Sequence, residues 1–456
     1  MDSEGIRQLV DEHARFAEAD ARRFGYQRDA GRQVAARLLD ASAERRAVVL
    51  DGPRRTGKSV ALRQVAVALR AGGLQHVHYC DLGDIRLSGV GVQALVEALV
   101  DTSTPSVHPV LLLDEVHYTG DRWAQEIKFV VDNVPVRVAV ADSAVAMVQS
   151  NLQQDLADRY NPVRIHPLPF AEWRDLRQHL GLPIADEEDG AAMGRECRQF
   201  LQLGGFPAHV ESRGEARSVH ELLRRQVVAQ AARDDIGRLR GLRDVDSLER
   251  LFVSRIANSG SLLNNLEAAQ LANVSAPTAR QWLQAMIDTK LLWPLLPFAR
   301  SAGKHERARA KLYSIDPGLV EACSIPVFGE PTTAVLGRQL ETAVAQALRV
   351  HAERRSGRLS YLQRAASTRQ GAEVDFILEH DGRTHAIECT LTDDARKLGP
   401  IKRHLDDSKL SPDTVAVVSL RTQRDVVDIA GTEVHLLPLH ELLLAVSDSQ
   451  LEDWPW

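Results

Sequence analysis

Cysteine is scarce in this 456-residue chain, and its four copies lie far apart. None of them has the short spacing that zinc sites and disulfide frameworks use, which predicts reduced, packed thiols. No stretch approaches the roughly 18 consecutive apolar residues of a membrane span, and the acidic N-terminus has no signal-peptide pattern. These absences predict a cytoplasmic protein without a membrane partner.

An excess of basic charge is also absent, because 56 Lys and Arg stand against 62 Asp and Glu, for a net charge of -6. Such a chain has no global attraction for nucleic acid, so any DNA contact must be local. The composition is that of a globular protein, with 44% hydrophobic and 26% charged residues. The length predicts a modular fold of about three domains.

A phosphate-binding loop is the most specific motif. A buried strand is predicted at 47–50 and an amphipathic helix at 60–69. Two glycines between them let the backbone wrap around phosphates, so that N–H groups and the helix N-terminus point at negative charge. Lys58 would act at the β and γ phosphates, and Ser59 would ligate Mg²⁺. The sequence therefore predicts bound ATP and Mg²⁺ at Gly52-Pro53-Arg54-Arg55-Thr56-Gly57-Lys58-Ser59.

Two acids follow a second apolar run, Val110 to Leu113. We expect Asp114 to hold the Mg²⁺ and Glu115 to orient and deprotonate the attacking water. The alternative for this pair, a solvated strand end, is less favoured because the phosphate-binding loop lies upstream.

Several motifs resemble those of bacterial and archaeal AAA-type ATPases that carry a poorly characterised C-terminal half. They are the phosphate-binding loop, Leu113-Asp114-Glu115-Val116, Arg159-Tyr160, Leu168-Pro169-Phe170, Gly204-Gly205-Phe206-Pro207, Asp316-Pro317-Gly318 and Glu373-Val374-Asp375-Phe376. The resemblance implies an AAA+-like α/β core that binds ATP. The family has Thr-Gly-Ser where this chain has Ala141-Asp142-Ser143, so γ-phosphate sensing would depend on Asp142 or Ser143. It also implies that Arg159 reaches a γ phosphate in its own or a neighbouring subunit, with a surface ion pair as the equal alternative.

Changes of pattern along the chain predict five segments. They are a helical N-terminal extension at 1–46, a P-loop ATPase core with a parallel sheet at 47–166, a helical lid at 167–243, a winged-helix domain at 244–325, and a small α/β domain at 326–456.

The winged-helix segment would contact DNA through its second helix, from Ala276 to Thr289, and through the loop that follows. Arg280 lies on the helix. The loop supplies the best phosphate-contacting patch, although a solvated charged loop or a protein-binding module is equally compatible. This patch comprises Arg300, Lys304, Arg307, Arg309 and Lys311.

Three acids in the last segment, Glu341, Asp375 and Glu388, match the layout of PD-(D/E)XK nucleases, and the resemblance supports that fold. Such acids would hold a second Mg²⁺. Thr390 stands where the nuclease lysine is expected. Cleavage is therefore disfavoured, and a nuclease-like domain used for docking is preferred.

The leading hypothesis is an ATPase that acts as a nucleotide-driven switch on DNA or a protein partner. One alternative is an ATP-gated, metal-dependent nuclease, and another is a regulatory module that binds nucleotide without hydrolysing it. The oligomeric state is open.

Overall fold

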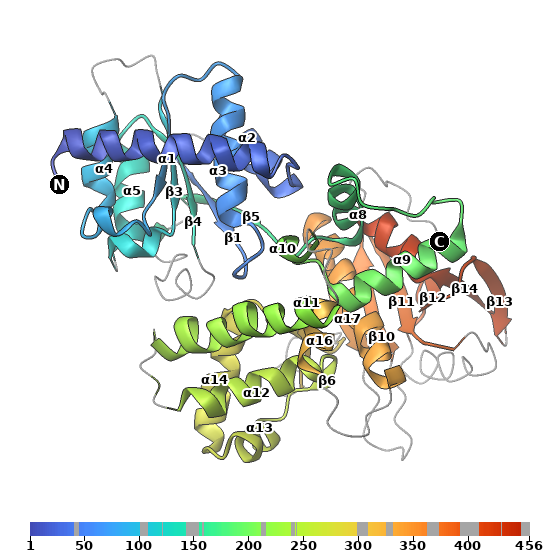
Figure 1. Cartoon of the computed structure of the whole chain (residues 1–456). Helices are drawn as coiled ribbons and strands as arrows, with labels where there is room; N and C mark the ends of the chain where they lie inside the picture. Colours follow the sequence, from blue (N-terminus) through green and yellow to red (C-terminus); the bar gives the residue numbers. More distant parts are fainter. Residues whose placement is uncertain are drawn as a thin grey trace. The chain divides into compact units, whose positions relative to one another are not determined.

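The computed structural model describes most of the chain, in two compact units (Figure 1). The first unit is Met1–His166 with Asp288–Lys290, and the second is Pro167–Ile287 with Leu291–Trp456. No helix within the described ranges is long and apolar enough to cross a membrane. Those ranges are 1–40, 45–100, 108–120, 122–142, 155–156, 159–210, 216–238, 242, 244–298, 309–324, 332–362, 374–392, 410–429 and 431–447.

A five-stranded sheet forms the centre of the first unit, with strand order β2-β3-β4-β1-β5 and every neighbouring pair parallel. Alternate residues of the central strands enter two separate apolar cores, as expected for a sheet covered on both faces. Its strands are β1 (Ala47–Asp51), β2 (Val77–Asp81), β3 (Val110–Asp114), β4 (Arg137–Ala141) and β5 (Tyr160–Arg164).

Helices cover both faces of this sheet. Residues of α2 (Asp29–Leu39) and α3 (Lys58–Ala71) enter the core on one face. Residues of α4 (Val92–Leu99) and α5 (Trp123–Asn133) enter the core on the other face. Short turns η2 (Ile85–Leu87) and η3 (Val116–Thr119) follow β2 and β3. The phosphate-binding loop therefore has a rigid strand on one side and a packed helix on the other.

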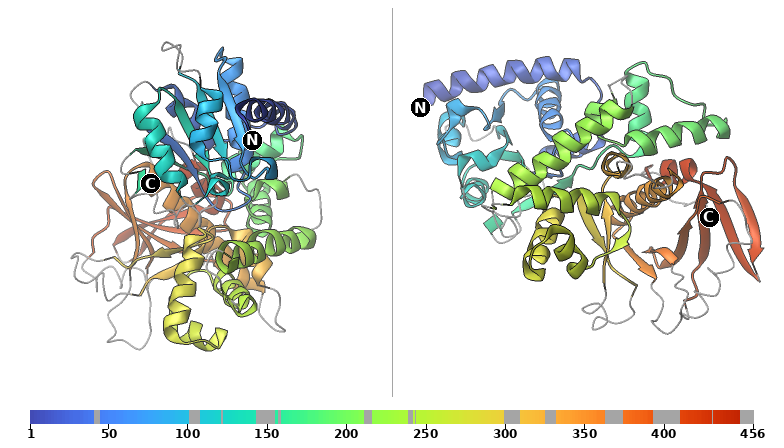
Figure 2. Two further views of the ribbon diagram at one scale, coloured as in Figure 1. Left: turned by 90° about the vertical axis from the view of Figure 1, so that its left-hand side faces the viewer. Right: turned by 60° about the horizontal axis from the view of Figure 1, so that its bottom comes forward.

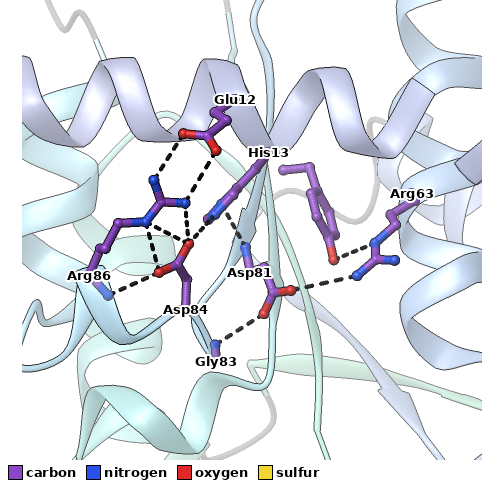
Figure 3. A network of polar contacts seen from close by, with 8 residues as sticks. Glu12, His13, Arg63, Asp81, Gly83, Asp84 and Arg86 are labelled. Carbon is purple, nitrogen blue, oxygen red and sulfur yellow. Dashed lines mark hydrogen bonds and ion pairs between the residues drawn. The ribbon is translucent and has the colours of Figure 1, made fainter. Parts of the chain in front are cut away.

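The long helix α1 (Ser3–Arg23) packs against this sheet and its helices through a polar network (Figure 3). His13 accepts a hydrogen bond from the Asp81 N–H at 3.2 Å and lies 3.2 Å from the Asp84 carboxylate. Arg86 bridges Asp84, at 2.7 Å, and Glu12, at 3.0 Å. The predicted N-terminal extension is thus part of the first compact unit.

The second unit begins with helices. They are α8 (Phe170–His179), α9 (Gly190–Leu203), α10 (Pro207–Val210), α11 (Ala216–Leu223), the π-helical segments η4 (Arg224–Ala229) and η5 (Ala231–Arg238), α12 (Val245–Ala257), α13 (Asn265–Ala272), α14 (Ala276–Asp288) and α16 (Pro317–Cys323). Residues from α11 to α14 and from α16 share one apolar core. The segment at 167–243 therefore packs with the C-terminal half, and its role as a lid stays a prediction.

Two motifs that are distant in sequence meet inside this unit. Asp316 accepts hydrogen bonds from the Gly205 N–H at 2.7 Å and the Leu319 N–H at 3.1 Å. Gly204 has a φ of 76°, and a Cβ there would lie 2.1 Å from the Asp316 carboxylate. A Cβ on Gly318 would lie 2.5 Å from the Leu203 carbonyl oxygen. Close backbone approach explains these glycines without any role in catalysis.

Two sheets complete the second unit. A small antiparallel sheet has the order β6-β8-β7 and contains β6 (Ser261–Leu262), β7 (Leu292–Leu295) and β8 (Lys311–Ser314). The larger, mixed sheet has the order β13-β14-β12-β11-β10-β9. Its strands, orange to red in Figure 2, are β9 (Arg358–Leu362), β10 (Val374–His380), β11 (Arg383–Cys389), β12 (Thr414–Ser419), β13 (Asp425–Ile429) and β14 (Thr432–Pro438). Helices α17 (Thr332–Arg354) and α19 (Leu439–Ser447) pack against it.

Candidate nucleotide site and a second acidic site

The phosphate-binding loop connects β1 directly to α3. Gly57 has a φ of 93° and Arg55 a φ of 65°, so two residues of the loop adopt the left-handed backbone conformation before the helix begins. Gly52 has a different role, because a Cβ there would lie 2.2 Å from the Ile165 carbonyl oxygen. The buried Thr56 hydroxyl donates to the Pro53 carbonyl at 2.8 Å. Arg54 is half-buried. The loop is thus held in shape by its own backbone and side chains.

Lys58 is the first residue of α3 and lies inside the loop. Its Nζ donates to the carbonyl oxygens of Gly52, at 2.9 Å, and Pro53, at 2.8 Å. Burial lowers the pKa of Lys58, and the nearby carboxylates of Glu115 and Asp51 oppose that effect. The ammonium group is therefore held where backbone N–H groups and a helix N-terminus also favour an anion.

Asp114 ends β3 beside the loop and is almost fully buried. Burial raises the pKa of Asp114, while hydrogen bonds from the Ser59 and Tyr79 hydroxyls act to lower it. Tyr79 donates to Asp114 at 2.9 Å and itself accepts from Arg63 at 2.9 Å. A hydroxyl and a carboxylate in contact are suitable donors for Mg²⁺.

Glu115 follows directly in a left-handed conformation, with a φ of 52°. Glu115 is the N-cap residue of the short helix η3. Burial raises the pKa of Glu115, and the charges of Asp142 and Asp114 raise it further. A carboxylate with a raised pKa beside a metal ligand is suited to accept a proton.

Asp142 follows β4 and is fully buried. It accepts two hydrogen bonds from His117, one from the backbone N–H at 2.8 Å and one from Nδ1 at 2.7 Å. His117 Nδ1 also lies 3.6 Å from the Glu115 carboxylate. Atoms of Glu115, His117 and Asp142 that could bind a metal lie within 4.8 Å of one another. Because the two oxygens of Asp142 accept N–H groups, we interpret this cluster as hydrogen-bonded rather than as a metal site.

Within its own chain, Arg159 fits the ion-pair alternative and not the contact with a γ phosphate. Arg159 precedes β5, and its carbonyl oxygen accepts from the Ala47 N–H, at the start of β1, at 2.9 Å. Since β1 and β5 are parallel, the phosphate-binding loop lies at the other end, roughly 16 Å away at about 3.3 Å per residue. The guanidinium instead pairs with Asp132 at 2.6 Å. Contact with a neighbouring subunit stays a prediction.

Arg28 is a site residue that the motif search missed. It lies at the N-terminus of α2, is buried, and donates to the carbonyl oxygens of Thr56 at 2.8 Å and His166 at 2.9 Å. Arg28 thereby supports the phosphate-binding loop from the N-terminal segment. No local pattern indicates this role, because its partners are distant in sequence.

The second unit brings the three predicted acids together. Glu341 comes from α17, Asp375 from β10 and Glu388 from β11. Glu388 accepts from the Asp375 N–H at 3.3 Å. Burial raises the pKa of Glu388 well above its usual range, and the charges of Asp375 and Glu341 add to the effect. The acids therefore form one electrostatically linked site.

A buried lysine, Lys311, completes this acidic site, although the sequence analysis predicts that it contacts DNA phosphates. The Lys311 ammonium lies 3.6 Å from the Glu341 carboxylate and 3.6 Å from the Asp375 carboxylate, and its side chain is 4% exposed. Tyr313, on the same strand, donates to Glu341 at 2.6 Å. The prediction that Lys311 contacts phosphates from a surface loop is wrong, because β8 directs it into the interior.

Other predicted DNA contacts have mixed outcomes. Arg280 and Arg309 are exposed, as a phosphate contact requires. Thr390 carries no charge, and its backbone N–H bonds to the Val418 carbonyl. The predictions for Arg300, Lys304, Arg307 and Ser143 concern residues outside the described ranges.

Comparisons with protein families agree with the geometry of the first unit. Residues 44–174 match a family model described as an AAA domain. Residues 194–326 and 336–442 match two models described as domains of unknown function, DUF8612 and DUF4143. The parallel sheet, the phosphate-binding loop and this match define residues 44–174 as an AAA-type P-loop domain.

Relatives of the whole chain are themselves uncharacterised. Rv2008c of Mycobacterium tuberculosis and Mb2031c of Mycobacterium bovis are each 24% identical over 435 residues, which cover 92% of this chain and 84% of theirs. Solved structures are more distant. The Walker-type ATPase PABY2304 of Pyrococcus abyssi is 14% identical with a TM-score of 0.45 and covers 64% of this chain and 95% of its own. The RuvB branch-migration motor of Thermotoga maritima is 18% identical with a TM-score of 0.29 and covers 62% and 90%.

Proposed function

We propose that the protein binds Mg²⁺ and ATP at the phosphate-binding loop, hydrolyses the nucleotide, and acts as a nucleotide-driven switch on DNA or a protein partner. One observation carries the proposal. The buried Lys58 ammonium, the N-terminus of α3 and the pair Ser59 and Asp114 surround the same loop. The Ser59 hydroxyl and the Asp114 carboxylate would hold Mg²⁺, which would supply positive charge to neutralise the phosphates.

Hydrolysis would depend on Glu115. Its carboxylate lies next to the proposed Mg²⁺ ligand Asp114, and its raised pKa suits a group that takes a proton from water. The remaining alternative, a module that holds nucleotide without hydrolysis, has the same binding site. Only a measurement of ATP hydrolysis distinguishes the ATPase from the non-hydrolysing module.

The test uses the full-length protein and two measurements, ATP affinity by calorimetry and phosphate release. We expect Lys58→Ala to weaken ATP binding about 100-fold or more, and Glu115→Gln to retain binding while it loses phosphate release. Lys128→Ala on α5 is the matched control and should change neither. ATP binding that survives Lys58→Ala would contradict the proposal. Binding without phosphate release in the native protein would favour the non-hydrolysing module.

A DNA partner is supported by element order in the second unit. Helix α12, strand β6, helices α13 and α14, and strands β7 and β8 follow one another as in a winged helix. Arg280 is exposed on α14. We expect Arg280→Ala to weaken DNA binding and to reduce its salt dependence, whereas Arg225→Ala, at a side chain that is 76% exposed, should not. A flat salt slope in the native protein would leave a protein partner as the switch target.

A second candidate function is metal-dependent cleavage of nucleic acid by the second unit. The observation that favours it is Lys311, which supplies the positive charge that Thr390 lacks. A divalent ion held by the three acids would activate water for attack on a phosphodiester. Lys311 would then offset charge on the phosphate.

Incubation with DNA and Mg²⁺ or Mn²⁺ tests this candidate. Cleavage should disappear in Asp375→Asn and in Lys311→Ala, with Asp381→Asn as the matched exposed control. If the native protein does not cut single- or double-stranded DNA in either metal, with or without ATP, this candidate is rejected and the ATPase proposal is unaffected.

A further inference from the structure

His117 and Asp142 form a pair at the nucleotide site that the proposed ATPase chemistry does not use. Two N–H groups of His117 bond to the Asp142 carboxylate, at 2.8 and 2.7 Å. Asp142 is 0% exposed, whereas the His117 side chain is 26% exposed. The pair therefore has a buried, fixed acid and an imidazole that reaches the surface of the site.

Strand register locates this pair at the phosphate end of the sheet. Ala141 lies beside Asp114 of β3 on one side and beside Leu50 of β1 on the other. Asp142 therefore leaves the sheet between the proposed Mg²⁺ ligand and the phosphate-binding loop. The negative charge of Asp142 also acts to raise the pKa of Lys58, against the larger effect of burial.

A carboxylate in this place would repel a triphosphate unless its charge were offset. His117 supplies that compensation, because it donates to both oxygens of Asp142. Since Nδ1 is engaged by Asp142, Nε2 is the ring nitrogen that remains to contact a ligand. A protonated imidazole donates from Nε2 to a phosphate oxygen, and the hydrogen bond is then charge-assisted.

We propose that His117 Nε2 hydrogen-bonds the terminal phosphate of a bound nucleoside triphosphate, with Asp142 as the positioning residue. The inference depends on the proposed binding of ATP at Lys58. It assigns to His117 the discrimination between ATP and ADP, since only the triphosphate carries the group that His117 would contact.

The electrostatics of the pair agree with a donating imidazole. Burial acts to lower the pKa of His117, but the hydrogen bond and charge of Asp142 and the charge of Glu115 raise it overall. Arg54, in the phosphate-binding loop, opposes this increase. The charged groups that face His117 are thus Asp142 after β4, Glu115 before η3, and Arg54.

The experiment measures ATP and ADP affinity with Mg²⁺ in the full-length protein and in His117→Ala, His117→Gln and Asp142→Asn. We expect His117→Ala to weaken ATP binding about 10-fold or more and ADP binding less than about 2-fold, because a hydrogen bond to a charged group is lost. Asp142→Asn should act in the same direction. His108→Ala, at the opposite end of β3, is the matched control.

A second readout is the pH dependence of ATP affinity. ATP affinity of the native protein should fall as pH rises through the His117 pKa, and this dependence should be absent in His117→Gln.

Two outcomes would overturn the inference. One is an ATP affinity of His117→Ala that stays within about 2-fold of the native value. The other is an equal loss of ADP and ATP binding in both His117 variants, which would assign the residue a structural role. If the native protein binds no nucleotide, the proposed function fails first, and the result is distinguishable because the native affinity itself is absent.

Discussion

The nucleotide site and the acidic site are built in different ways. Most nucleotide-site groups come from one continuous loop after β1, and Asp114 and Glu115 follow at the end of β3, which β4 separates from β1. The acidic site takes Lys311, Glu341, Asp375 and Glu388 from four separate elements. Local backbone geometry defines the first site, whereas only the packing of β8, α17, β10 and β11 defines the second. A motif search is therefore far more informative about the first.

The largest effect expected from a single substitution concerns the lysine of the acidic site. Lys311→Ala leaves two largely buried carboxylates without their cation, and breaking such a pair costs about 3 kcal/mol of unfolding free energy. Denaturant unfolding of the second unit measures the change. Arg309→Ala, on the same segment but exposed, should stay within about 0.5 kcal/mol. Equal effects of the two changes would show that Lys311 is not the central cation of the site.

In a thermal unfolding experiment, Mg²⁺ and ATP should distinguish the unfolding transitions of the two units. At a concentration about 100 times the Kd, a ligand stabilises the folded state by about 2.7 kcal/mol. We expect this increase for the first unit and none for the second. Removal of Mg²⁺ with a chelator should reduce it. A shift of the second unit with ATP in the Lys58→Ala protein would show that nucleotide also binds elsewhere.

Acid should weaken the second unit through two buried histidines. His351 on α17 and His385 on β11 each contact His380, with ring centroids 5.0 Å apart. Burial and the neighbouring His380 lower the pKa of each to about 4.

Because the folded pKa is below the unfolded value, the unfolded state binds more protons between about pH 6.5 and 4. Stability should fall in that window as pH falls, by on the order of 2 kcal/mol per histidine at pH 5. Denaturant midpoints at pH 5 and 7.5 measure it, and His385→Gln should reduce the difference. A midpoint that does not change with pH would contradict the assignment.

The smallest expected effect belongs to Arg159. Its ion pair with Asp132 is partly exposed, so Arg159→Ala should change stability by less than about 1 kcal/mol. ATP affinity at low protein concentration should be unchanged because the residue lies at the other end of the sheet. If Arg159→Ala lowers hydrolysis only at protein concentrations where the native protein self-associates, a contact with a neighbouring subunit would be supported.

These contrasts show what a sequence can predict for such a chain. The strand, loop and helix around Lys58 were predicted because each is encoded within a few residues. The convergence of Glu341, Asp375 and Glu388 was predicted from their placement on a helix and two strands, with support from a family resemblance. The role of Lys311 was predicted wrongly, since a basic residue near a charged loop and a buried cation on a strand look alike in sequence. Arg28 and the pairing of His117 with Asp142 had no local signal.

The sequence by itself determined the phosphate-binding loop, because glycine positions and a strand followed by a helix establish a local backbone path. Tertiary structure decided which end of the sheet Arg159 occupies, which acids surround Lys311, and that Asp142 holds His117. The physical reason is that proximity between distant residues depends on strand order and direction, and no single segment contains that information.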